Sequence, residues 1–81
     1  MEPDTKKNAD RERVMSAYTR EMNEAIEYRE QKEYIWAAYK CGMALGFVRA
    51  GFVNGCILLD DYERLMLDGR ELFTKILMEG C

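Results

Sequence analysis

Apolar and polar residues alternate at helical spacing along most of this chain. The apolar positions recur in steps of three and four residues, first as Met15, Tyr18, Met22 and Ala25, then as Trp36, Tyr39, Met43 and Gly46. A repeat of this kind is typical of a helix that packs along one stripe. No proline or glycine occurs between residues 9 and 41. We therefore predict one helix over residues 9–50, preceded by a flexible tail at residues 1–8.

A turn is predicted at residues 51–54, followed by a second helix over residues 55–78. Gly51 suits the left-handed position that ends a helix, and Asn54 can cap the next one. Because so short a link normally joins antiparallel helices, the predicted fold class is all-α. We expect a long helix and a shorter helix in an antiparallel αα-hairpin, within one domain spanning residues 9–81.

The two predicted helices differ in length, at roughly 60 and 35 Å. The part of the first helix without a partner carries an apolar flank: Met15, Tyr18, Met22, Ala25 and Ile26. Either a second copy covers this flank, or the helix breaks near residues 30–32 and folds back. Residues 30–32 favour helix and offer no turn chemistry. We therefore predict a homo-oligomeric helical bundle, a homodimer, with these five residues at the interface.

Small residues stand four apart along one edge of the first helix, at Ala38, Gly42, Gly46 and Ala50. A glycine inside a helix costs roughly 1 kcal/mol relative to alanine. Two of them on one edge indicate that another backbone approaches closely there.

Composition excludes several classes of function. The 81 residues carry a net charge of −3, and their twelve lysines and arginines form no basic cluster, which disfavours nucleic acid as a ligand. Histidine is absent, the three cysteines are far apart and no glycine-rich phosphate loop is present, so we expect no enzyme activity, metal or cofactor.

Lys40 and Arg49 interrupt the most apolar stretch, which argues against a membrane span. Free thiols and the lack of a leader pattern favour the cytoplasm.

Aromatic and acidic residues mark the candidate site for binding a partner. Aromatic surface is concentrated within two helical turns by Tyr28, Tyr34, Ile35, Trp36 and Tyr39. Tyrosine and tryptophan are enriched at binding hot spots, so we expect Tyr28, Tyr34 and Trp36 to anchor the partner. Glu24, Glu27 and Glu30 belong to a line of carboxylates that would steer a basic partner. The competing interpretation is ordinary packing beside a solvated acidic face.

Residues 50–54, Ala-Gly-Phe-Val-Asn, lead to Asp60-Asp61-Tyr62-Glu63-Arg64-Leu65. This stretch resembles the hairpin of small helical proteins of phages and mobile elements, which include inhibitors of host defence such as some anti-CRISPR proteins. The resemblance implies a non-enzymatic interaction protein that binds and blocks a host protein in the host cytoplasm.

Two alternatives remain open. In the first, an oligomer forms a small-molecule or nucleotide sponge, with Arg29, Lys32 and Arg49 holding a phosphorylated ligand. In the second, the chain is an accessory protein that binds nucleic acid.

Overall fold

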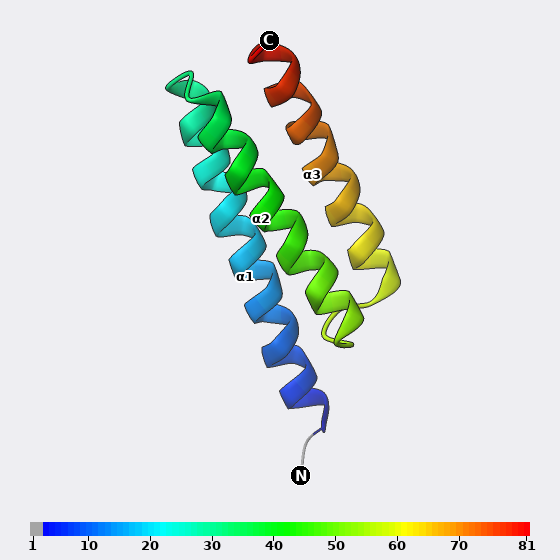
Figure 1. The fold of residues 1–81 in the computed structure, drawn as a ribbon. Coiled ribbons are helices and arrows are strands. Elements are labelled where there is room, and N and C mark those ends of the chain that lie inside the picture. The colour runs from blue at the N-terminus through cyan, green and yellow to red at the C-terminus, as the bar shows by residue number, and fades with distance from the viewer. Residues whose placement is uncertain (1–2) are drawn as a thin grey trace.

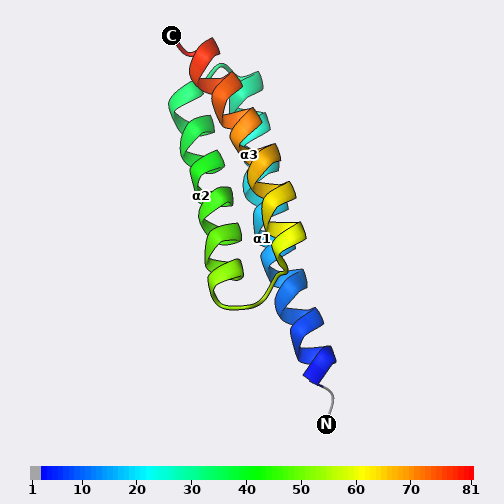
Figure 2. The same cartoon turned by 90° about the vertical axis from the view of Figure 1, so that its right-hand side faces the viewer.

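The computed structural model describes residues 3–81, and this range folds into three helices. They are α1 (Pro3–Glu30), α2 (Tyr34–Val53) and α3 (Leu59–Glu79). Successive helices run in opposite directions (Figure 1). Figure 2 shows α2 on one side of the molecule, with α1 and α3 both on its other side. The Cα atoms span 51 × 18 × 13 Å. The predicted all-α class is confirmed, whereas assembly into an oligomer stays a prediction.

The single helix predicted over residues 9–50 is wrong, because the chain turns back at residues 31–33. Lys32 adopts a left-handed backbone conformation, with φ of 63°. The N–H of Glu33 donates to the Tyr28 carbonyl (2.8 Å), and the N–H of Lys32 donates to the Arg29 carbonyl (3.0 Å). These two bonds form a Schellman motif, a common helix ending in which glycine usually takes the left-handed position. The fold-back alternative is therefore the one found.

The second turn lies four residues later than predicted. Gly55 is the left-handed residue (φ 75°), and Cys56 N–H donates to the Gly51 carbonyl (2.8 Å) in a second Schellman motif. Gly51 is buried inside α2. A Cβ added to it would lie 2.8 and 2.9 Å from the two methyl carbons of Val14, so only glycine fits there. Glycine at this position serves the close approach of α1 to α2, and the prediction of a turn there is wrong.

The N-terminal tail predicted at residues 1–8 is wrong from residue 3 onward, since α1 begins at Pro3. Proline is tolerated in the first turn of a helix, where its missing N–H has no partner within the helix. Residues 1 and 2 of the predicted tail lie outside the described residues.

The core consists of two clusters along α2. One cluster joins Tyr18, Ala44, Val48, Ile57 and Leu65, and the other joins Ala25, Ala37, Cys41 and Ile76. The fully buried alanines let α1 and α2 approach closely. The Tyr18 hydroxyl donates to the Leu65 carbonyl (3.2 Å), which ties α1 to α3.

Two ion pairs connect α1 to α3. Arg11 contacts both carboxylate oxygens of Asp61 (2.8 and 3.2 Å), and Arg29 does the same to Glu79 (2.8 and 2.6 Å). Hydrogen bonding to the guanidinium lowers the pKa of each carboxyl group. With Tyr18 between them, these pairs fix the register of α1 against α3.

The apolar flank predicted to need a second copy is largely covered by the chain itself. Tyr18 and Ala25 are buried, Met15 and Met22 are partly buried in the core clusters, and Ile26 is 41% exposed. The reason given for an interface at these residues is therefore wrong, because α2 folds back over the flank. A buried side chain cannot contact a second copy unless the helices separate.

Candidate functional site

An aromatic cluster lies on the surface where α1 ends and α2 begins. The rings of Tyr28 and Trp36 stack with centroids 6.2 Å apart, and Tyr39 meets Trp36 edge-on at 5.9 Å. Trp36 and Tyr39 remain 53% and 55% exposed. The turn at residues 31–33 creates this cluster, since it brings the last turn of α1 beside the first turns of α2. We call Tyr28, Trp36 and Tyr39 the aromatic cluster.

Acidic residues border the aromatic cluster. Glu27 and Glu30 are exposed, whereas Glu24 is partly buried. A small hollow beside Tyr28 is lined by Glu24, Glu27, Tyr28, Gln31 and Lys40. The structure therefore brings the predicted Glu24 and Glu27 to the same surface as Tyr28 and Trp36.

The one lysine in this hollow is engaged by carboxylates. Lys40 Nζ lies 3.0 Å from Glu24 Oε1 and 3.5 Å from Glu21 Oε1, and Arg20 Nε lies 3.0 Å from Glu21 Oε2. Contact with Glu24 raises the pKa of Lys40, although burial opposes the shift. Glu21 is 3% exposed, so these two cations compensate a buried charge. Glu27 is the unengaged charge of the hollow beside Tyr28, whereas Lys32 and Glu33 line a second hollow beside Trp36. Glu30 is exposed and lines neither hollow.

Tyr34 lies beside the aromatic cluster, where it lines a hollow with Trp36, as predicted, and with Lys32, Glu33, Ile35 and Gly80. Its ring is partly buried against the end of α3, where a Cβ added to Gly80 would lie 3.0 Å from the Tyr34 Cβ. It lines an apolar hollow between the start of α2 and the end of α3, together with Ile35, Ala38, Ile76, Leu77, Gly80 and Cys81.

The side of α2 that faces away from α1 and α3 is apolar and largely uncovered, and Trp36 at its edge stacks on Tyr28 of α1. We call this the outer face; it comprises Ile35, Trp36, Tyr39, Gly42, Met43, Gly46, Phe47, Arg49, Ala50 and Val53. Met43 is partly buried, and the other nine residues are exposed. A Cβ added to Gly42 or Gly46 would meet nothing within 4 Å. The close backbone approach predicted for these glycines is therefore absent within the chain, and Gly69 packs under Leu45 instead.

Sequence reasoning missed Ile35, Phe47 and Val53 as exposed apolar residues. A usable signal was present: α2 holds only two charged residues among 20, Lys40 and Arg49. A helix that is apolar around its whole circumference is normally buried on every side. Two helices of this chain cover only part of it.

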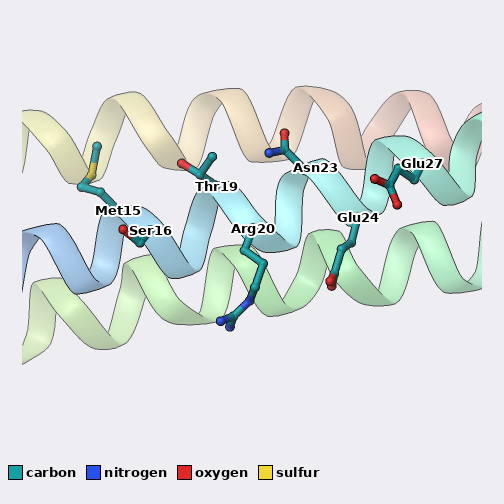
Figure 3. A pocket seen from close by; sticks show the side chains of 7 residues that line it. All are labelled: Met15, Ser16, Thr19, Arg20, Asn23, Glu24 and Glu27. Carbon is teal, nitrogen blue, oxygen red and sulfur yellow. The ribbon is translucent and has the colours of Figure 1, made fainter.

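A shallow surface on α1 carries polar side chains. Met15, Ser16, Thr19, Arg20, Asn23, Glu24 and Glu27 line it, all from α1 (Figure 3). The cations proposed for a phosphate-binding sponge do not gather there. Arg29 is paired with Glu79, Lys32 lies in the turn, and Arg49 lies on the outer face of α2.

Comparison with protein-family models, curated proteins and solved structures gave no match. Across residues 3–81, no helix combines the length and apolar character needed to cross a membrane. Among the side chains described from residue 8 onward, no three cysteine, aspartate or glutamate residues gather into a possible metal site.

Proposed function

We propose that this chain is a non-enzymatic interaction protein of a phage or mobile element that self-associates and blocks a host protein, such as a defence protein, in the host cytoplasm. The observation that supports the proposal most is the stacking of the exposed Trp36 ring on the partly buried Tyr28 ring. Two rings held against each other lose little side-chain entropy on binding, and aromatic residues of this kind dominate the energy of many interfaces.

The bordering charges favour one kind of partner. Glu27 is exposed beside Tyr28, where the nearby Lys40 is already paired with Glu21 and Glu24. Lys32 and Glu33 stand together beside Trp36, so the net charge around the aromatic cluster is negative on its Tyr28 side. An apolar pocket rimmed by lysine and arginine would complement this arrangement. Rim charges of this type mainly raise the association rate, whereas the aromatic anchors set the lifetime of the complex.

The test compares the wild type with Trp36→Ala, using Leu67→Ala as the matched control. Leu67 is 58% exposed on α3, so its removal trims apolar surface away from the aromatic cluster. Proteins captured from host lysate by the wild type and by Leu67→Ala, but not by Trp36→Ala, are then purified and tested one by one for direct binding. Losing a hot-spot side chain weakens affinity about thirtyfold or more.

A spectroscopic measurement identifies the contact itself. Trp36 is the only tryptophan, so 5-fluorotryptophan places a single ¹⁹F nucleus in the aromatic cluster. We expect its resonance to shift when the purified host protein is added, and Glu27→Gln with Glu30→Gln to slow association more than it speeds dissociation. An unmoved ¹⁹F resonance in a formed complex, or equal binding by Trp36→Ala, would reject the aromatic cluster as the anchor.

A further inference from the structure

The outer face of α2 is large enough to hold a second protein chain. Ile35 and Val53 are 85% and 75% exposed, and Trp36 and Tyr39 are about half exposed. At roughly 150 Å² for a whole large apolar side chain, these four leave about 400 Å² uncovered, or about 800 Å² in a symmetric pair. Phe47, Met43 and the uncovered glycine backbone add to this. The total approaches the roughly 1,000 Å² of a specific interface.

Six residues of the outer face lie at positions equally spaced about the level of Ala44, while Trp36, Met43 and Phe47 have no counterpart on this face. Two residues on either side of Ala44 are Gly42 and Gly46. Five residues on either side are Tyr39 and Arg49, and nine residues on either side are Ile35 and Val53. Ala38 and Ala50 are likewise symmetric, at six residues. Residues 35, 39, 42, 46, 49 and 53 are separated by alternating steps of four and three, which is the spacing of a two-helix seam.

From the uncovered apolar area and this seam spacing we infer that the outer face of α2 pairs with the outer face of a second copy, in antiparallel orientation, around a two-fold axis at the level of Ala44. Such a pair sets Gly42 against Gly46 of the other copy, and Ile35 against its Val53. A dimer of this kind uses the same patch on both subunits, as a two-fold interface requires. The inference rests on the self-association in the proposed function, and not on the host protein.

The glycines explain how the two helices would pack. Helix axes lie 8–10 Å apart depending on the side chains between them, and glycine allows the lower end of that range. Within one chain no atom lies within 4 Å of a Cβ added to Gly42 or Gly46. These glycines therefore lower helix stability without improving the packing of the single chain. The second copy supplies the close backbone approach that the sequence predicts.

Charge also favours a second copy over an acidic or basic partner. Arg49 is the one charged residue of the outer face, and no carboxylate among the side chains described at residues 8–81 lies within ion-pair distance of it. In the antiparallel pair it lies opposite Tyr39 of the other copy, where a guanidinium can stack on the ring. The two acidic chains then meet along a face that carries no acidic residue.

The test measures association and stability in Gly42→Ala/Gly46→Ala, with Thr74→Ala as the control. Thr74 is exposed on α3, so the control also improves helix propensity without touching the outer face. Sedimentation equilibrium should show a wild-type dimer and a dimer constant at least tenfold weaker in the double variant. In dilute solution, where the protein is monomeric, the same variant should melt about 4 °C or more above the wild type.

These opposite effects separate association from folding. A double variant that dimerises as well as the wild type rejects the outer face as the interface but leaves self-association standing. A wild type that stays monomeric at several hundred micromolar rejects both the interface and the proposed self-association. Trp36 and Tyr39 belong to both the outer face and the aromatic cluster. Host binding is therefore read by adding Trp36→Ala to the Gly42→Ala/Gly46→Ala variant, in which pairing of the outer faces does not compete.

Orientation is tested by cross-linking in a background with Cys56→Ser and Cys81→Ser. Ile35→Cys mixed with Val53→Cys should join rapidly through a short thiol cross-linker, whereas either protein alone should not. Cross-linking of Ile35→Cys with itself would indicate a parallel pair and overturn the inference.

Discussion

Replacing Lys32 with glycine tests the fold-back at residues 31–33 by the sign of one free-energy change. Lys32 is the only non-glycine residue with positive φ among those the structure describes, at 63°. Steric strain in this conformation lowers the stability of the folded state by roughly 1–2 kcal/mol for an L-residue. Glycine has no such strain, but its greater freedom in the unfolded state lowers stability by roughly 0.5–1 kcal/mol. Lys32→Gly should therefore raise the free energy of unfolding by about 0.5–1 kcal/mol.

The assay is urea unfolding followed by circular dichroism, together with a thermal melt. A gain of this size raises the melting temperature of a domain of this length by about 2–8 °C. Lys32→Ala is the control, because alanine meets the same steric cost as lysine and should change little. If residues 9–50 formed one helix, glycine would instead cost about 1 kcal/mol and alanine would stabilise. A loss of stability in Lys32→Gly would refute the turn.

Three further predictions follow from the core. Gly51→Ala should destabilise by about 1–3 kcal/mol in urea unfolding, because its Cβ overlaps Val14; a neutral or stabilised variant would show that α1 does not lie there. Cys41 is fully buried, and burial raises its pKa to about 11. A thiol reagent at pH 8 should therefore label the exposed Cys81 quickly and Cys41 only through unfolding. Equal labelling rates would contradict the packing of Cys41. Burial raises the pKa of Tyr18 from 10.0 to about 12. The unfolded state therefore loses this proton first, and the free energy of unfolding should fall between pH 10 and 12. Tyr18→Phe should reduce that fall, and an unchanged alkaline stability profile would argue against burial of the hydroxyl.

The helical class could be predicted from periodicity, but the number of helices could not. Glu30, Gln31 and Lys32 are good helix formers, and lysine gives no sign that it will take a left-handed conformation. The break is favoured by tertiary packing, since folding back buries Tyr18 and Ala25 against α2. Local propensity of this size is easily overridden by burial of an apolar flank.

The second turn was predicted at Gly51 instead of Gly55, because tertiary packing again decides which residue ends the helix. Gly51 and Gly55 both fit the end of a helix by sequence, and only the position of Val14 shows that Gly51 is needed for packing. Gly42 and Gly46 were correctly predicted to lie on one edge, but that edge faces away from the rest of the chain.

The candidate site was partly predictable. Tyr28, Trp36, Glu24 and Glu27 lie together as expected, because the turn brings the adjoining ends of α1 and α2 side by side. Tyr34 packs against the end of α3 and also lines a hollow with Trp36. Tyr39 was expected to add to the aromatic surface but was not placed in the candidate site, although its ring contacts Trp36. The direction of a side chain on α2 depends on where α1 and α3 sit, which spacing alone does not give.

The pairing of α2 with a second copy is tested most directly by one inter-chain distance. A spin label at Asn54→Cys, in the background with Cys56→Ser and Cys81→Ser, lies at the end of α2 beyond the paired residues. In the antiparallel dimer the two labelled positions are separated by 20 residues along the paired helices, so double electron–electron resonance should give a distance of about 30 Å. A distance near 10 Å would indicate parallel helices, and the absence of dipolar modulation would indicate a monomer; either result would contradict the antiparallel pairing.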